Sequence, residues 1–285
     1  MKASAPGKII LFGEHAVVYK RHALVSAISL RCYVEVKRSN DFRIISPLGK
    51  TSLDFEVHPY ISYAVKRFCE YKDIGGAEIR ISSEIPMSSG LGSSAAVTVA
   101  TLKALSEEFE AGLSNEDIFE IAKAVELDVQ GRASGTDPFI STFGGAWLIP
   151  DKKRVEIPYD LFVVMLGEKS TAEMVKRVAI LRERYTDVIE KIFDAIDEIA
   201  IKAFENIGNL EVLEELIGIN QSLLRALGVS TPEIDRTIAK LEELGYKTKI
   251  TGAGGGGCIF GIAKREIPMG IRVRCNEEGV RIEDS

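Results

Sequence analysis

Ile85-Pro-Met-Ser-Ser-Gly-Leu-Gly-Ser-Ser-Ala-Ala96 is the most informative stretch of this sequence, because two glycines and four serines lead directly into a predicted helix. Gly90 and Gly92 allow backbone conformations that side chains disfavour, so that successive N–H groups can turn toward one ligand. A helix that begins near Ser93 adds the positive end of its dipole. The segment therefore predicts a phosphate-binding loop. The alternative is a turn that only starts a helix, and a single glycine pair would favour that reading.

The composition limits the classes of partner. The chain has 285 residues, 46% of them hydrophobic, and a formal net charge of −6, which argues against a general nucleic-acid binder or a binder of anionic membranes. No window reaches the ~18 apolar residues of a membrane span. The four cysteines are widely spaced and form no CxxC pair, so we expect neither a disulfide framework nor a zinc site. We expect a small-molecule partner, no nucleic acid, no membrane and a cytoplasmic location.

The first half of the chain reads as sheet followed by helices. Residues 24–37, 42–46 and 77–83 alternate or are β-branched, which predicts strands. Helices are predicted over 93–109 and 114–130, the second capped by Ser114 with Asp117 three residues later. Residues 138–149 read as a strand that is broken at Gly144-Gly145. The polar, proline-led turn at 150–154 is the predicted boundary between two domains, 1–150 and 151–285.

The second half reads as a strand at 161–166, a long helical stretch and a small sheet. One amphipathic face is formed by Val188, Ile189, Ile192, Phe193, Ile196, Ile199, Ala200, Ala203 and Phe204. A helix capped by Thr231 with Pro232 at its first position should end at Gly245. Strands are predicted at 247–251, 258–263 and 271–275. Both halves are therefore α+β.

Three further segments carry groups that could do chemistry. Lys8 follows a Pro-Gly turn, and Glu14-His15 follows a second glycine beyond an apolar strand. For Lys8 a solvated edge residue, and for His15 a hydrogen-bonded core histidine, are open alternatives.

The segment 249–260 places five glycines in six positions between two strands, which suggests close approach of a backbone or a ligand, or else a glycine-rich hairpin. Glu126 and Asp137 could converge from different elements, and one of them could hold Mg²⁺, which prefers oxygen ligands. Asp137 could also be a turn former before proline.

Taken together, residues 6–18, 85–96 and 251–258 resemble the three motifs of the superfamily of galactokinases, homoserine kinases, mevalonate kinases and phosphomevalonate kinases. The motifs occur in the family's order, span nearly the whole chain, and come without a GxxxxGK[ST] sequence. Within the superfamily, Gly13-Glu-His-Ala-Val-Val18 and the stretch ending at Asp137 are similar to mevalonate kinases of the compact archaeal and bacterial type. The resemblance implies a two-domain α+β kinase fold, with an N-terminal domain of the ribosomal protein S5 type and a C-terminal ferredoxin-like domain. It also implies a homodimer.

The resemblance further implies ATP-dependent phosphorylation of the primary hydroxyl of mevalonate, in isoprenoid precursor synthesis. Asp137 and Lys8 match the catalytic pair, and Ser94 and Glu126 match the magnesium ligands. Substrate contacts are implied for Glu14, His15 and Thr171. The implied nucleotide-binding residues are Pro86, Ser88, Ser89, Gly90, Leu91, Gly92, Ser93, Ser94, Ala95, Gly252, Ala253 and Gly254. The alternatives are a sibling kinase for phosphomevalonate, homoserine or a sugar, and a nucleotide-binding regulator without turnover, which the presence of Lys8, Glu126 and Asp137 disfavours.

Overall fold

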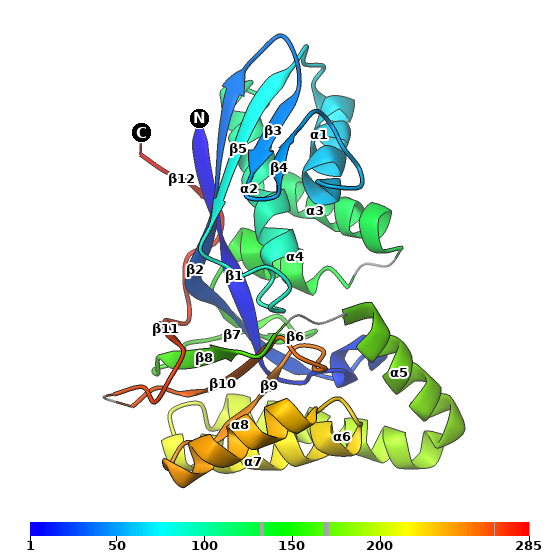
Figure 1. Ribbon diagram of the computed structural model, residues 1–285, viewed down its shortest axis with the longest axis vertical. Coiled ribbons are helices and arrows are strands. Elements are labelled where there is room, and N and C mark those ends of the chain that lie inside the picture. The colour runs from blue at the N-terminus through cyan, green and yellow to red at the C-terminus, as the bar shows by residue number, and fades with distance from the viewer. Residues whose placement is uncertain (132–133, 168–170, 265, 285) are drawn as a thin grey trace.

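The computed structural model describes residues 1–131, 134–167, 171–264 and 266–284. For Thr171 it describes the backbone but not the side chain. Figure 1 shows two layered halves joined by the long strands β1 and β2. The upper half contains a large sheet with helices α1–α4, and the lower half contains a small sheet above helices α6–α8. Among the described residues, no helix is long and apolar enough to cross a bilayer.

The large sheet is built around β1, which lies between β12 and β2. Its strand order is β12-β1-β2-β5-β3-β4, and β6 pairs with both β2 and β7. All of its pairings are antiparallel except that of β3 with β5. The strands are β1 (Lys2–Phe12), β2 (Ala23–Arg38), β3 (Arg43–Ser46), β4 (Gly49–Thr51), β5 (Ala77–Ser83), β6 (Ala146–Ile149), β7 (Lys153–Val155) and β12 (Arg281–Ile282). The three strands predicted at 24–37, 42–46 and 77–83 are therefore confirmed, with small shifts at their ends.

The helices of the upper half are α1 (Pro59–Tyr71), α2 (Ser93–Glu108), α3 (Asn115–Gln130) and α4 (Thr136–Phe143), and a short 3₁₀ helix, η1, spans Ala16–Tyr19. Helix α2 contacts β1, β2, α1, α3 and α4, and it is accordingly buried on most of its surface. The predicted cap of α3 is confirmed, because the Ser114 side chain accepts from the Asp117 N–H and the Asp117 carboxylate accepts from the Ser114 N–H.

The strand predicted over 138–149 is wrong in its first half. Residues 136–143 form α4, and only Ala146–Ile149 form a strand. Gly135, at φ 71°, turns the chain into the helix, Asp137 and Pro138 occupy its first turn, and Gly144, at φ 67°, ends it. A short apolar run of this length fits a helix or a strand equally well by periodicity alone, and tertiary packing selects between them.

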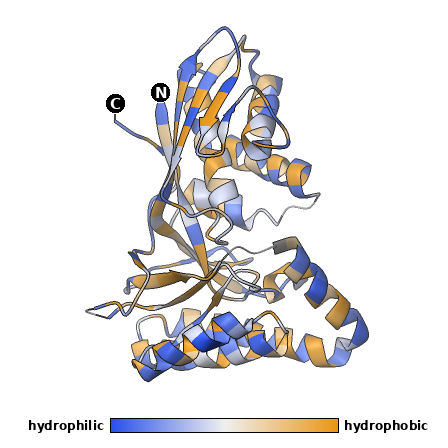
Figure 2. Ribbon diagram, viewed as in Figure 1, coloured by the Kyte–Doolittle hydropathy of each residue, from blue (hydrophilic) through white to orange (hydrophobic). Residues whose placement is uncertain are grey.

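The small sheet has the order β11-β8-β10-β9 and is antiparallel throughout. Its strands are β8 (Leu161–Met165), β9 (Thr248–Thr251), β10 (Cys258–Ile262) and β11 (Ile271–Val273). The helices are α5 (Thr171–Arg184), α6 (Thr186–Glu205), α7 (Leu210–Ala226) and α8 (Pro232–Glu243). Figure 2 shows apolar strands in this sheet beside helices that alternate between polar and apolar residues, which is the pattern of a buried sheet face covered by amphipathic helices.

Two details of this half differ from the predictions. Val188 is 59% exposed, although it was placed on the buried face of α6. Its neighbour Ile189 points into the core, and adjacent helical residues are rotated by about 100° from each other. The cap of α8 by Thr231 with Pro232 is confirmed, but the helix ends at Glu243, two residues before Gly245.

Segments on both sides of residue 150 meet in the large sheet, because β7 pairs with β6, and β12 near the C-terminus pairs with β1. The division into 1–150 and 151–285 stays a prediction. Helices and strands combine as the α+β class predicts. The consequence for the site is that β1 connects the phosphate loop, the small sheet and the C-terminal segment.

Candidate active site

The structure brings together the two side chains that were predicted to be catalytic. Lys8 lies on β1 with 6% of its side chain exposed, and Asp137 lies in the first turn of α4 with 29% exposed. The Nζ atom of Lys8 is 3.2 Å from Oδ1 of Asp137. A sheltered ammonium beside a partly open carboxylate gives a reacting group access to both charges, and it excludes the solvated-edge alternative for Lys8.

Glu126 joins this pair from α3. Its Oε2 accepts a hydrogen bond from the Gly135 N–H at 3.2 Å, just before α4 begins. Burial and the neighbouring charge of Asp137 raise the pKa of Glu126 to about 7, while the Gly135 hydrogen bond and Lys8 act in the opposite direction. The two carboxylates therefore do converge from different elements, and the charge of Asp137 disfavours the ionised form of Glu126.

The loop before α2 forms a cradle of backbone N–H groups. Ser88, Gly90 and Gly92 have positive φ angles of 54°, 81° and 78°. The N-cap residue of α2 is Gly92, which has no side chain to cap the helix. The first intrahelical bond is donated by the Ala96 N–H to the Gly92 carbonyl, so the N–H groups of residues 93–95 lie ahead of it. These groups and the helix dipole suit a phosphate.

Internal contacts hold this loop in place. The Ser89 hydroxyl donates to the Pro86 carbonyl at 2.7 Å, and Leu91 is fully buried in the core. The Lys8 N–H donates to the Leu91 carbonyl at 2.8 Å. A Cβ at residue 92 would lie 2.8 Å from Cγ of Lys8, which explains why glycine is needed there. Ser89, Leu91 and Ala95 thus support the loop with buried side chains, whereas Ser88 is exposed and Pro86, Ser93 and Ser94 are half-buried.

The third glycine segment is the loop of the β9–β10 hairpin, in which Cys258 pairs with Thr251. Both sequence interpretations hold, because the hairpin also meets another backbone closely. A Cβ at Gly254, where φ is 74°, would lie 2.4 Å from the Val229 carbonyl oxygen. Gly252 and Ala253 open this loop at the end of β9. The Thr251 hydroxyl bonds both the N–H and the carbonyl of Ile10, so the hairpin is fixed to β1.

Glu14 and His15 lie at the turn after β1, and both are buried. Nε2 of His15 donates to the Ala253 carbonyl at 2.9 Å. Glu14 has no exposed surface and pairs with Lys249 of β9, which is also fully buried. The sequence interpretation assigned no role to Lys249, and the sequence Thr248-Lys-Ile-Thr251 of β9 gives no clear signal that this lysine is buried. Direct substrate contact by Glu14 stays a prediction, and the structure gives its carboxylate a protein partner instead.

The side chain of Thr171 lies outside the described residues, as do residues 168–170 before it. The backbone of Thr171 begins α5. Its predicted contact with the substrate therefore stays a prediction.

The predicted magnesium ligands are oxygen groups at the start of α2 and on α3. Ser94 lies in the first turn of α2, and Glu126 supplies a carboxylate whose ionised form a cation would favour. Magnesium in kinase sites is held by one or two carboxylates together with waters and phosphates. In the described part of the chain, no three His, Cys, Asp or Glu side chains form a metal-binding group.

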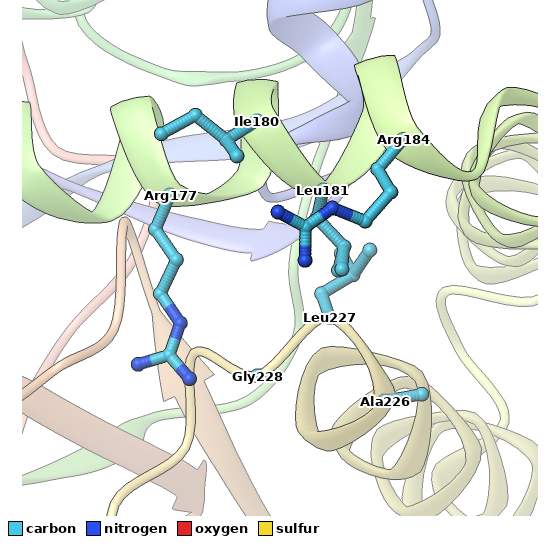
Figure 3. A pocket seen from close by; sticks show the side chains of 7 residues that line it. All are labelled: Arg177, Ile180, Leu181, Arg184, Ala226, Leu227 and Gly228. Carbon is cyan, nitrogen blue, oxygen red and sulfur yellow. The ribbon is translucent and has the colours of Figure 1, made fainter.

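A separate cavity of about 260 Å³ lies between α5 and the end of α7 (Figure 3). Figure 3 shows the Arg177 side chain extending toward Gly228 and the Arg184 side chain toward Leu227. None of the predicted site residues whose side chains the structure describes lines this cavity. The lining residues are Arg177, Ile180, Leu181, Arg184, Ala226, Leu227 and Gly228.

Comparisons with known proteins agree with this geometry. The family models described as GHMP kinases N terminal domain and GHMP kinases C terminal match residues 59–145 and 200–269. The chain is 64% identical to a mevalonate kinase of Archaeoglobus fulgidus over 285 residues, which is 100% of both chains. It is 39% identical to a mevalonate kinase of Methanothermobacter thermautotrophicus over 268 residues, or 90% of this chain and 88% of that protein.

Solved structures show the same likeness. The Methanococcus jannaschii mevalonate kinase superimposes with a TM-score of 0.82 at 30% identity, covering 100% of this chain and 98% of that one. The L. major mevalonate kinase in complex with R-mevalonate gives a TM-score of 0.77 at 27% identity, covering 92% and 87%. The chain therefore belongs to the GHMP kinase family and, within that family, to the mevalonate kinases.

Proposed function

We propose that this chain transfers the γ-phosphoryl group of ATP to the primary hydroxyl of mevalonate, giving 5-phosphomevalonate and ADP. The observation that carries the proposal is the Lys8–Asp137 pair, with 3.2 Å between Nζ and Oδ1, on a strand that also contacts the phosphate loop. The 64% identity to a mevalonate kinase over the whole chain supports mevalonate as the substrate.

Phosphoryl transfer requires mainly positioning and charge stabilisation, and different residues of the site provide them. The N–H groups at the start of α2 bind the phosphates. Lys8 stabilises the negative charge that develops on the transferred phosphoryl oxygens, and its stem is held in place by the loop at Gly92. Asp137 accepts or orients the hydroxyl proton of the substrate. Because a loose transition state requires little prior deprotonation, both roles of Asp137 are compatible with this arrangement.

Ser94 and Glu126 would hold Mg²⁺ in this proposal. When bound, the ion neutralises charge on the β- and γ-phosphates. Glu126 must be ionised to act as a ligand, and Lys8 already favours that form. Substrate contacts are proposed for His15 and Thr171. Glu14 belongs to the same turn as His15, and its carboxylate pairs with Lys249.

The test is an ADP-release assay with mevalonate, phosphomevalonate, galactose and homoserine compared side by side. We expect turnover with mevalonate and a rate at background with the other three. If only one of the other three compounds is turned over, the chain is a kinase for that compound and not for mevalonate. ADP release with none of the four would refute the proposal. A homodimer and a cytoplasmic location also stay predictions, and light scattering of the purified protein checks the first.

A further inference from the structure

A buried ion pair joins the first and third motifs of the chain. Lys249 on β9 and Glu14 after β1 are each 0% exposed, although 235 residues separate them in the sequence. The ammonium of Lys249 donates to Oε1 of Glu14 and, at 2.8 Å, to the Ile250 carbonyl. The rings of Phe12 and Phe260 lie 5.6 Å and 5.1 Å from the same nitrogen. The pair is thus enclosed by aromatic rings and has no contact with solvent.

A buried ion pair of this kind contributes little to the stability of the fold. Burial raises the pKa of Glu14 and lowers that of Lys249, because both charged forms lose hydration. Oε2 of Glu14 is also buried and has no hydrogen-bond partner among the described residues, which adds to the cost. Replacing a buried pair by apolar groups is often neutral or stabilising, so a retained pair calls for another explanation, such as fixing one geometry.

The elements that the pair connects suggest what is fixed. Glu14 lies six residues after Lys8 at the far end of β1, and Lys249 lies three residues before Gly252, where the hairpin loop opens. Two weaker contacts reinforce the same junction, namely Thr251 with Ile10 and His15 with Ala253. The pair is the charged contact among these three, and it sets how far the hairpin reaches along β1.

We propose that Glu14 and Lys249 are positioning residues. They hold the glycine hairpin of residues 252–257 at the position along β1 where the hairpin and Lys8 contact the same nucleotide phosphates. The inference rests on the proposed function and deepens it. In this proposal neither side chain touches the reacting atoms. The pair therefore acts through the placement of the hairpin, and its loss should weaken nucleotide binding and turnover even when the fold is kept.

The test compares Glu14→Met, Lys249→Met and the double variant with the parent protein. Each single variant leaves one buried group unpaired and should lower Tm. The double variant removes both charges and should recover most of that Tm. Its Kd for a non-hydrolysable ATP analogue should nevertheless stay about tenfold weaker than that of the parent. Its kcat should fall by about tenfold or more, since small displacements in an active site are costly.

The matched control is Val164→Ala on β8, a buried residue on another strand of the same sheet. It should lower Tm and keep the parental Kd at a temperature well below its own Tm. The proposal is overturned if the double variant has the parental Kd and kcat, or if Val164→Ala loses as much affinity.

If the double variant does not fold, Glu14→Asp decides the question. It keeps the charge but shortens the side chain by one methylene, and it should weaken the analogue Kd, whereas a parental Kd would overturn the proposal. A parent protein that binds the analogue but does not phosphorylate mevalonate would refute the proposed function only. The analogue Kd values of the variants would still test the positioning role of Glu14 and Lys249.

Discussion

Replacing Gly92 by alanine should lower kcat strongly but lower Tm only slightly. Gly92 has a φ of 78°, a region that costs a residue with a Cβ roughly 1–2 kcal/mol. The new Cβ would also lie 2.8 Å from Cγ of Lys8, whereas carbon atoms pack at about 3.5–4.0 Å. One of the two must therefore move by about 0.7 Å or more. The flexible stem of Lys8 is the easier part to displace, and its Nζ atom would then lose its place beside Asp137.

The assay measures kcat from mevalonate-dependent ADP release and Tm from calorimetry. A misplacement of about 1 Å can cost 10²-fold in rate, so we expect kcat to fall by about 10- to 100-fold. The backbone cost alone should lower Tm by about 2–4 °C per kcal/mol.

Gly112→Ala is the matched control for this prediction. Gly112 has a φ of 67°, and a Cβ there would meet nothing within 4 Å. It should show the same backbone cost in Tm with the parental kcat. Equal kcat values for the two alanine variants would refute the claim that close contact with Lys8 is what requires glycine at residue 92.

Three further predictions address the carboxylates and the metal. Asp137→Asn should lower kcat by about 10²- to 10⁴-fold with little change in nucleotide Kd, as measured by single-turnover kinetics and titration. Near-normal turnover would remove Asp137 from the mechanism. Ser94→Ala should shift the Mg²⁺ dependence of the rate to higher concentration, and an unchanged titration would exclude its hydroxyl as a ligand. Arg67 donates hydrogen bonds to both carboxylate oxygens of Asp128 at 2.8 Å, and these bonds lower the pKa of Asp128. The pair therefore stabilises the fold above the unfolded pKa of about 4, and this stability is lost as pH falls through the lower folded pKa. Asp128→Asn should cost about 1 kcal/mol at pH 7 in urea unfolding and nothing at a pH below the folded pKa, and an equal cost at both pH values would contradict the assignment.

The parts of the fold that could be predicted from the sequence are those fixed by local chemistry. The cap at Ser114 and the Thr231-Pro232 start of α8 depend on residues within three or four positions of each other, and both are confirmed. The segment at 136–143 lacks such a decisive local signal. Its apolar residues suit either a helix or a strand, and contacts of α4 with α2 and β1, which come from distant parts of the chain, favour the helix.

The same distinction explains the site. Its glycine segments can be found one by one, because each needs backbone conformations that only glycine adopts easily. The partners of Lys8 are harder to find, since Asp137 follows it by 129 residues and adopts its position only when α4 packs against β1.

Lys249 is the strongest case, because a lysine in a short strand normally indicates an exposed edge, and β9 is indeed the edge strand of its sheet. Lys249 is buried because Phe12 at the end of β1, Glu14 in the turn after it and Phe260 on the neighbouring strand β10 surround its ammonium group. A buried charge of this kind can be recognised only after the fold has shown which oppositely charged group lies beside it. It follows that a sequence in which either member of the pair was replaced would still predict the same elements, and yet would have lost one of the contacts between the hairpin and the β1 end of the site.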